Sequence, residues 1–402
     1  MGIDTIPKDK VPVPIERAGM SRFYSGVNPL IHRGLPFAQA LTLVARVTAG
    51  PKLLGCRGRK PSYHPGMDTP SRLGLVVIGA GPAGLGVAIA AARAGLDYEV
   101  VEKGAVVDSI YRFPKGMTFF TTAELLELGN LPFVTPYAKP TREEVLQYYR
   151  RVADTHRLAV SLGERVESID PEADGFAVAT VVERPGGAPL ARTRHARSVV
   201  VATGTYGQPN ALGIPGEDLP HVSHYFDEPH PCHRRRVVVV GGSNSAAEAA
   251  LALCRAGAVV TLVHRRERLS GSIKYWVKPD VENRIAEGSI AARFESQVVR
   301  IGPDGVVVEG PVGREELPAD VVYLLTGYRP DVALLERAGV RVDPQTLTPA
   351  HDPRTFETNV PGLYLAGAIV SGTDGNRVFI ENGRFHGAAV VKAIVAGADA
   401  RG

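Results

Sequence analysis

The feature that most constrains the fold of this chain is the stretch from Leu73 to Glu102. It begins with an apolar run over residues 73–78, passes through the turn Gly79-Ala-Gly-Pro-Ala-Gly84, and ends with Tyr98-Glu-Val-Val-Glu102. A buried strand, a Gly-x-Gly-x-x-Gly turn, a helix and a second strand that ends in a carboxylate are typical of a dinucleotide-binding unit. The sequence therefore predicts an α/β fold with a phosphate-binding turn at this point.

Each residue of the turn has a physical role. Gly79 permits the tight turn, Gly81 lets the backbone approach a pyrophosphate, and Gly84 lets the helix lie close to the strand. The phosphates then meet free N–H groups at a helix N-terminus. Glu102 suits ribose hydroxyls and would repel a ribose phosphate, so the site favours FAD or NAD over NADP. The predicted contacts of this first site are Gly79, Gly81, Pro82, Ala83, Gly84, Glu102 and Lys103.

Composition and charge exclude several classes of protein. The 402 residues suggest two to three domains, and a net charge of +4 with scattered arginines does not indicate nucleic-acid binding. No apolar run approaches the roughly 18 residues of a membrane span. The three cysteines form no Cys-x-x-Cys pair, so we expect a cytoplasmic protein without structural disulfides.

Residues 1–70 differ from the rest of the chain in being rich in proline and in scattered arginine and lysine. They lack the compact apolar core and cleavage site of a secretory signal. We expect a poorly ordered extension, or a start assigned upstream of Met67, which lies just before the first strand.

The middle of the first unit carries aromatic residues and a predicted meander. Phe113, Phe119 and Phe120 follow the second strand, where they either wall a flavin ring or belong to the core. Thr141 and Glu144 predict a capping box for a helix over residues 141–156. Alternating segments over residues 160–198, with a Pro-Gly-Gly turn at 185–187, predict antiparallel strands. A separate buried strand follows, and it ends in two further predicted site residues, Thr203 and Gly204.

A second nucleotide-binding unit repeats the first. Arg236-Val-Val-Val-Val240 enters a glycine-rich turn, a helix runs from about Ser245 to Arg255, and a strand follows over residues 259–263. Two positions depart from the motif, with Ser243 and Ala246 replacing the second and third glycines. Both residues are small enough to preserve close approach.

The end of the second unit differs in charge from the first. Where the first unit has Glu102, this one has His264-Arg265-Arg266, and arginines at this position accommodate a 2′-phosphate. The alternative is a solvated basic turn. We predict FAD in the first site and NADPH in the second. The predicted contacts of the second site are Gly241, Gly242, Ser243, Asn244, Ser245, Ala246, His264, Arg265 and Arg266.

The C-terminal part returns to the first unit. A strand ends at Thr326-Gly327, another runs through Gly367 and Ala368, and the last helix opens near Asn382. We predict two Rossmann-like, three-layer ββα domains, with the NADPH domain inserted in a discontinuous FAD domain. The predicted boundaries are an extension at 1–70, the FAD domain at 71–213 and 329–402, and the NADPH domain at 214–328.

From about residue 73 onward the chain resembles the two-dinucleotide-binding flavoproteins of the thioredoxin-reductase-like group. Within that group it is most similar to the YpdA-type bacillithiol disulfide reductases. The matching stretches are Val107-Asp-Ser-Ile-Tyr-Arg-Phe-Pro, Met117-Thr-Phe-Phe, Leu131-Pro-Phe, Ala202-Thr-Gly-Thr-Tyr-Gly-Gln, Pro220-His-Val-Ser-His-Tyr-Phe, Gly241-Gly-Ser-Asn-Ser-Ala, Ser272-Ile-Lys-Tyr-Trp and Phe379-Ile-Glu-Asn-Gly-Arg-Phe-His-Gly. The resemblance implies an FAD enzyme that uses NADPH to reduce a small-molecule disulfide, bacillithiol disulfide. We also expect a homo-oligomer.

The chain differs at three points from the groups of proteins that it resembles. It lacks the Cys-x-x-Cys pair of thioredoxin reductases, which excludes thioredoxin reduction by that route. Ala83 stands where well-known YpdA-type members have a cysteine, which leaves direct transfer to the disulfide, a substitute thiol or a different acceptor open. Ala368 stands where related flavoproteins place an aspartate for the ribityl chain, and Asp374 is the predicted substitute.

Neither of the later cysteines is a strong catalytic candidate. We expect Cys254 to pack in the core of a helix. Cys232 has His233 beside it and His221 nearby, so a zinc site or an activated thiolate competes with a polar linker. Because the spacing matches no familiar zinc pattern, we expect no metal site. His386 is a weak candidate for protonating a leaving thiolate, and its alternative is a structural contact.

Three other functions remain open from the sequence. A ferredoxin-NADP reductase of the same fold also lacks Cys-x-x-Cys. A flavin-containing monooxygenase is suggested by Ile214-Pro-Gly216 and the later His221, although this match is poor. A non-enzymatic NADPH-sensing flavoprotein would bind nucleotide without turnover.

Overall fold

The computed structural model describes residues 72–399, except residues 185 and 376. The described residues belong to one compact unit. The predicted extension, with Cys56 and Met67, lies outside the described residues, as does Pro185 of the predicted turn. Among the helices of the described part, none is long and apolar enough to cross a membrane.

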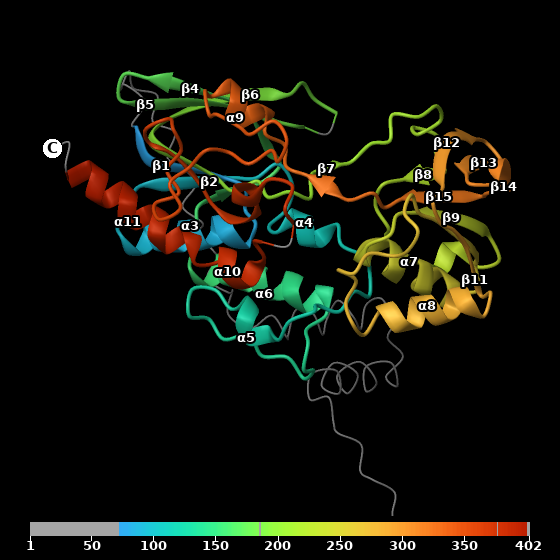
Figure 1. The fold of residues 1–402 in the computed structure, drawn as a ribbon. Helices are drawn as coiled ribbons and strands as arrows, with labels where there is room; N and C mark the ends of the chain where they lie inside the picture. Colours follow the sequence, from blue (N-terminus) through green and yellow to red (C-terminus); the bar gives the residue numbers. More distant parts are fainter. Residues whose placement is uncertain (1–71, 185, 376, 400–402) are drawn as a thin grey trace, which may run out of the picture. The chain divides into compact units, whose positions relative to one another are not determined.

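The first sheet has seven strands, in the order β3-β2-β1-β6-β5-β4, with β17 also paired to β6 (Figure 1). β1 pairs in parallel with β2 and β6, which confirms the predicted nucleotide-binding unit. The strands are β1 (Leu73–Ile78), β2 (Tyr98–Val101), β3 (Val160–Ser161), β4 (Glu164–Glu172), β5 (Gly175–Val182), β6 (Leu190–Val201) and β17 (Leu363–Leu365).

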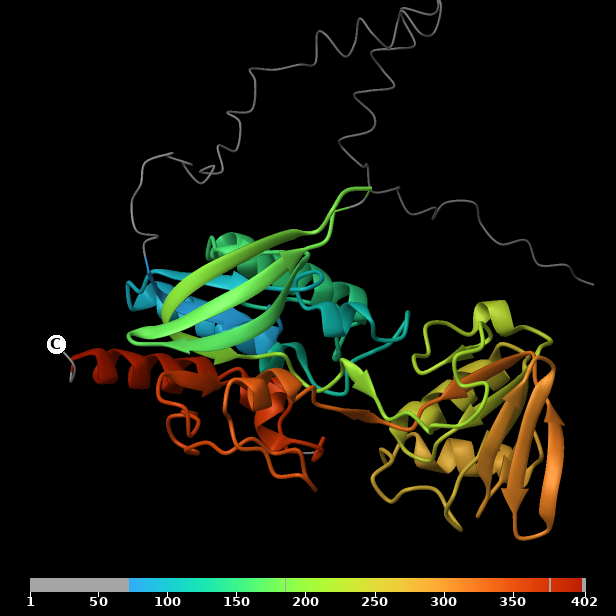
Figure 2. The same cartoon turned by 90° about the horizontal axis from the view of Figure 1, so that it is seen from above.

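The long strand β6 corrects one prediction. The sequence suggested a meander that ends near Ser198 and then a separate buried strand, but β6 is continuous from Leu190 to Val201. Its first part pairs antiparallel with β5, and its second part pairs in parallel with β1 and β17. The long strands β4, β5 and β6 lie side by side in Figure 2. The change in hydrophobic pattern therefore marks a change of partner within one strand.

The second sheet has five parallel strands in the order β11-β10-β9-β15-β8. A separate antiparallel sheet contains β12, β13 and β14. The strands are β8 (Val222–Ser223), β9 (Arg236–Val240), β10 (Val259–Val263), β11 (Ile290–Arg293), β12 (Gln297–Gly302), β13 (Gly305–Gly310), β14 (Gly313–Pro318) and β15 (Val321–Leu324). The second predicted nucleotide-binding unit is thus confirmed as β9, a helix and β10.

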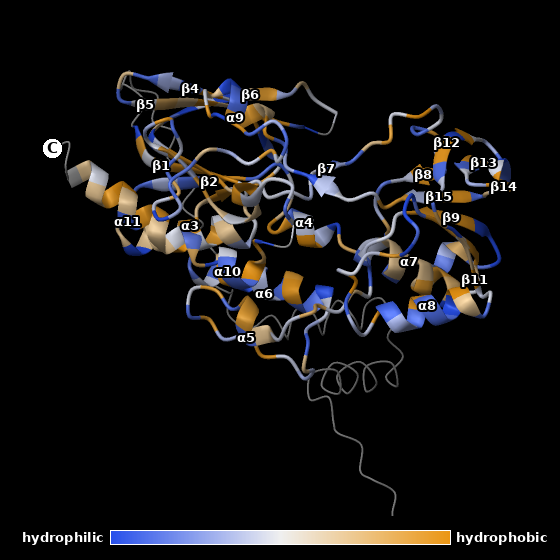
Figure 3. Cartoon of the chain, in the orientation of Figure 1, coloured by the Kyte–Doolittle hydropathy of each residue, from blue (hydrophilic) through white to orange (hydrophobic). Residues whose placement is uncertain are grey.

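Both central strands are buried on two faces. In β1, Leu75 and Val77 face a core that includes α3, α6 and α11, whereas Val76 and Ile78 face a core that includes β5. In β9, alternate valines face α7 on one side and the β12–β14 sheet on the other. Figure 3 shows the apolar residues concentrated in these inner strands. This arrangement of a strand between a helix layer and a sheet layer confirms the expected three-layer ββα fold.

The helices pack on the sheets, and α3 and α7 begin directly after the two glycine turns. The predicted capping box is present on α6, where Thr141 and Glu144 exchange hydrogen bonds. The predicted closing helix differs, because a short α10 ends at Gly383 and α11 begins anew at His386. The helices are α3 (Pro82–Arg93), α4 (Asp108–Tyr111), α5 (Ala123–Leu126), α6 (Arg142–Thr155), α7 (Asn244–Arg255), α8 (Lys278–Ala286), α9 (Ala333–Arg337), α10 (Ile380–Gly383) and α11 (His386–Asp399), with short 3-10 turns η1 (His230–Cys232) and η2 (Gly367–Ser371).

Two connecting segments join the nucleotide-binding units. They pair as a short antiparallel ribbon of β7 (Gln208–Pro209) and β16 (Tyr328–Arg329). Because β17 follows β16 and pairs with β6, the chain enters and leaves the second unit through this ribbon and completes the first sheet last. The insertion of one domain in the other is therefore a property of the fold.

Candidate functional sites

A cavity of about 590 Å³ lies at the first glycine turn. It is at the carboxyl ends of β1, β2 and β6, which is where open α/β sheets bind ligands. Most of the predicted first-site residues line it, namely Gly79, Gly81, Pro82, Ala83, Glu102, Lys103, Thr203, Gly204 and Gly367. The fold thus brings together residues from three distant parts of the sequence.

The glycines of this turn have the predicted geometry. Gly79 has φ +105°, and a Cβ added to Gly84 would lie 2.0 Å from the carbonyl oxygen of Gly79. A Cβ added to Gly81, in contrast, would meet no atom within 4 Å. Gly84 is therefore required for packing beneath the turn, whereas Gly81 leaves open space where a phosphate could approach the backbone.

Glu102 is only 7% exposed, and its carboxylate accepts hydrogen bonds from the backbone of the turn. Its Oε2 accepts the N–H of Ala80 at 2.7 Å, and its Oε1 accepts the N–H of Gly104 at 2.8 Å. Burial raises the pKa of this carboxyl, and the two hydrogen bonds oppose that rise. The carboxylate keeps lone pairs for ribose hydroxyls, so it can both shape the turn and contact a ligand. The sequence predicted only the second role.

Aromatic and charged side chains form other parts of the cavity wall. Phe113, Phe119 and Phe120 all line the cavity, and Phe119 also belongs to the buried core, with 7% exposure. Arg112 lines the cavity as well and pairs with Asp108 at 2.7 Å. The only sequence feature that points to this pair is its place after the second strand.

The C-terminal part of the chain contributes Gly367 to the cavity wall, beside the glycine turn. This glycine has φ +78°, and a Cβ added to it would lie 2.7 Å from the Cβ of Ala83. Its N–H donates to Nδ1 of His386 at 3.1 Å. Asp374 is exposed and is not part of the cavity wall, whereas Ala368 lines it. The structure therefore does not bring Asp374 to the position suggested for it.

The second glycine turn tolerates a larger residue than the first. Gly241 has φ +151°, and a Cβ added there would lie 2.8 Å from the Cβ of Ala246 and 2.5 Å from the carbonyl oxygen of Leu325. Ala246 thus packs at the position where the first unit needs Gly84. Ser243 and Ser245 are exposed at the start of α7.

The imidazole of His264 lies over Gly242. A Cβ added to Gly242 would be 2.2 Å from Cε1 of that ring. Burial lowers the pKa of His264, and the positive charges of Arg266 and Arg265 lower it further. Both arginines are exposed, and within the described residues neither guanidinium forms an ion pair. The end of β10 therefore presents positive charge that is available to an anionic ligand.

Asn244 clamps the loop that follows the basic turn. Its Nδ2 donates to the carbonyl of Ser272 at 3.2 Å, and its Oδ1 accepts the N–H of Lys274 at 2.9 Å. The same loop carries Trp276, whose ring centroid lies 6.0 Å from that of Phe120 in the first cavity wall. This loop therefore links the second glycine turn to the first cavity, a contact that the sequence pattern did not reveal.

Neither described cysteine lines the first cavity. Cys232 is 3% exposed, and its Sγ lies 3.8 Å from Oη of Tyr323. Cys254 contacts the carbonyl of Ser289 at 3.7 Å. Across the described residues no group of three or more His, Cys, Asp or Glu side chains is placed to hold a metal.

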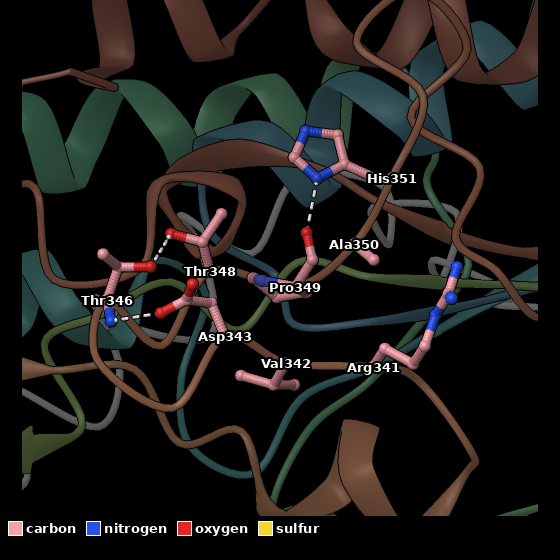
Figure 4. A pocket seen from close by; sticks show the side chains of 8 residues that line it. All are labelled: Arg341, Val342, Asp343, Thr346, Thr348, Pro349, Ala350 and His351. Carbon is pink, nitrogen blue, oxygen red and sulfur yellow. Dashed lines mark hydrogen bonds between the residues drawn. The ribbon is translucent and has the colours of Figure 1, made fainter.

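A second hollow, of about 600 Å³, is open and is lined by none of the predicted site residues (Figure 4). Its polar side chains bond mainly within their own loop. Asp343 accepts the N–H of Thr346 at 2.8 Å, and His351 bonds the carbonyl of Pro349 at 2.7 Å. These contacts shape the loop and suggest no binding chemistry.

Comparisons with known proteins agree with this arrangement. Residues 76–367 match the pyridine nucleotide-disulphide oxidoreductase family. The chain is 40% identical over 323 residues to the bacilliredoxin reductase Bdr of Bacillus subtilis (strain 168), covering 79% of this chain and 96% of the relative.

Two solved structures are similar as well. The bacillithiol disulfide reductase Bdr (YpdA) from Bacillus cereus has a TM-score of 0.78 and 38% identity, covering 81% of this chain and 99% of that chain. The protein of that name from Staphylococcus aureus has a TM-score of 0.75 and 37% identity with the same coverage. The chain therefore belongs to the pyridine nucleotide-disulphide oxidoreductase family, and within it to the Bdr (YpdA) type of oxidoreductase.

Proposed function

We propose that this protein uses NADPH and FAD to reduce a low-molecular-weight disulfide, bacillithiol disulfide. The observation that carries the proposal is the opposite charge at the ends of the two nucleotide-binding units. Glu102 closes the first unit, whereas the free guanidinium groups of Arg265 and Arg266 close the second. A carboxylate favours a ribose with free hydroxyls, and arginines favour a ribose 2′-phosphate. The names of the Bacillus cereus and Staphylococcus aureus relatives support the choice of substrate.

The residues of the first cavity fit FAD. The open space at Gly81 and the helix start behind it suit a pyrophosphate, and Glu102 suits the adenosine ribose. Thr203 and Gly204 bring the end of β6 to the same cavity, while Phe113 and Phe120 shield it from water. Bound FAD supplies two-electron transfer between nucleotide and disulfide.

The net reaction defines what the residues must support. One NADPH and one proton convert one disulfide into two thiols and leave NADP⁺. The described cysteines do not line the cavity, and Ala83 has no thiol. We therefore infer that none of the thiols within residues 72–399 relays electrons to the substrate disulfide. The wall residues of this chain bind and orient the reactants and exclude water.

Several electron acceptors other than bacillithiol disulfide are compatible with the fold. The Bacillus subtilis relative is called a bacilliredoxin reductase, so a bacilliredoxin disulfide is the nearest alternative acceptor. Because Ala83 has no thiol, ferredoxin is a second alternative acceptor, as in a ferredoxin-NADP reductase. A flavin-containing monooxygenase would consume oxygen and form an oxygenated product. An NADPH-sensing protein would show tight nucleotide binding and no turnover with any acceptor.

One experiment separates these functions. The purified protein should be yellow from bound flavin, and anaerobic NADPH should bleach its visible absorbance. Bacillithiol disulfide, oxidised bacilliredoxin, glutathione disulfide and ferredoxin are then added in separate samples. We expect bacillithiol disulfide to restore the yellow colour fastest. Faster recovery with bacilliredoxin or ferredoxin would replace the proposed acceptor, and recovery with none of them would favour the sensor.

We also propose a homo-oligomer in the cytoplasm, with domain boundaries near residues 71, 214 and 329. Light scattering of the purified protein would test the oligomer, and limited proteolysis would test the boundaries. A monomeric mass, or cleavage only within β9–β15, would contradict these proposals.

A further inference from the structure

His386 lies at the start of α11 and joins that helix to the wall of the first cavity. Its Nδ1 accepts the N–H of Gly367 at 3.1 Å. Its ring stacks on Phe356, with 4.2 Å between centroids and 22° between planes. Phe356 is fixed beside β17 because its carbonyl accepts the N–H of Leu365 at 2.9 Å. The imidazole is therefore held from two sides at the strand end that carries Gly367.

The contacts of His386 also define its protonation state. Burial, with a smaller contribution from His351, lowers its pKa to about 4. The imidazole is neutral at pH 7, and because Nδ1 accepts a hydrogen bond, its proton is on Nε2. A neutral imidazole is a poor acid for protonating a thiolate near pH 7. The structure therefore favours the contact role over the general-acid role that was considered from the sequence.

The start of α11 is a rigid base for this contact. A Cβ added to Gly387 would lie 2.5 Å from the backbone carbon of Gly86 in α3. The two helices thus meet backbone to backbone, one residue after His386, and α3 begins directly at the phosphate turn. His386 is consequently fixed relative to the turn that contains Ala83.

Gly367 packs directly against Ala83, since a Cβ added to Gly367 would lie 2.7 Å from the Cβ of Ala83, and both residues line the cavity. We propose that His386 is a positioning residue that holds Gly367 against the Gly79–Gly84 turn and so keeps this part of the FAD cavity wall in the shape that binds FAD. The inference rests on the proposed function in taking FAD as the occupant. It does not depend on which disulfide or carrier is reduced.

Three variants separate the hydrogen bond from the ring. His386→Phe keeps a ring for Phe356 and removes the acceptor. His386→Gln moves the side-chain amide away from the Nδ1 position. His386→Asn loses the ring but places an acceptor close to that of Nδ1. The measurements are hydrogen exchange of the Gly367 amide in the full-length apoprotein and the dissociation constant of FAD.

The Phe and Gln variants should speed exchange at Gly367 and weaken FAD binding by about tenfold, because each leaves a buried donor without its acceptor. The Asn variant should stay within about threefold of the unmodified protein. Equal results for Asn and Phe, or unchanged exchange in both acceptor-loss variants, would overturn the inference. If these results hold but no disulfide is reduced, the substrate proposal fails and the positioning role stands.

Discussion

The two nucleotide-binding units of this chain share an architecture and differ at the points where a ligand would touch them. In both, a parallel strand buried on two faces enters a glycine turn and a helix of twelve residues. The first unit ends in the buried carboxylate of Glu102, and the second ends in the exposed Arg265 and Arg266. The fold is therefore common to both sites, and a few side chains at the strand end separate their ligands.

The units also differ in how they use charge for stability. In the first, Arg194 is 10% exposed and bonds Glu99 at 2.7 Å, and its guanidinium pairs with Glu164 at 2.6 Å. In the second, Arg236 pairs with Asp320, and the two side chains are 45% and 34% exposed. Buried charges depend on their partners far more than exposed ones do. The first unit should therefore be the more sensitive to loss of a single arginine.

The largest expected effect tests this difference. Arg194→Met removes the cation that the buried Glu164 and the partly exposed Glu99 share, leaves Glu164 only the more distant Arg192 at 3.4 Å, and should lower the free energy of unfolding by about 3 kcal/mol. Arg236→Met is the matched control, and it should leave the unfolding midpoint nearly unchanged because its partner is solvated. Urea unfolding of both variants checks the prediction. Equal losses would mean that burial does not distinguish the two units.

The second prediction concerns the third position of each glycine turn. Gly84→Ala should destabilise the first unit by about 1–3 kcal/mol and release flavin, since its Cβ would overlap the carbonyl of Gly79. Ala246→Gly in the second unit should leave flavin content unchanged. The ratio of visible to ultraviolet absorbance measures bound flavin. Full flavin content in Gly84→Ala would show that the turn can relax, and the proposed packing role would be wrong.

The smallest expected effect is a dependence of stability on pH. Hydrogen bonds and charge from Arg194 lower the pKa values of Glu99 and Glu164 despite their burial. Their contribution is fully present above the ordinary carboxyl pKa and is lost as pH falls through the lowered values. The unmodified protein should thus lose more stability than Arg194→Met between about pH 5 and pH 3. Parallel acid profiles for the two proteins would exclude this contribution.

Local pattern was enough to predict the two nucleotide-binding units but not the contacts between distant segments. The turns at Gly79 and Gly241 follow apolar strands directly, so their structure depends on neighbouring residues. The continuity of β6 was missed because one strand exchanges an antiparallel partner for a parallel one near Ser198, and the hydrophobic pattern changes there. The hydrophobic pattern of a strand indicates which of its faces are buried, but it does not show where the strand begins and ends.

Contacts between residues far apart in the sequence could not be predicted from local sequence patterns. Arg194 lies 95 residues from Glu99, and His386 lies 19 residues from Gly367. Asn244 was correctly placed at the second turn, but its clamp on the loop of Lys274 depends on packing 30 residues later. The suggested role of Asp374 rested on proximity in sequence, and the fold leaves that residue exposed outside the cavity wall.

The positive charge at the end of β10 is proposed to select NADPH for the second unit. The most direct measurement is kcat/KM for NADPH and for NADH in the double variant Arg265→Ala with Arg266→Ala. We expect NADPH efficiency to fall about 10- to 100-fold and NADH efficiency to change little, because only NADPH carries the 2′-phosphate. Arg268→Ala, on the same exposed turn, is the control and should affect neither nucleotide strongly. An equal loss of kcat/KM with both nucleotides would show that Arg265 and Arg266 do not recognise the 2′-phosphate.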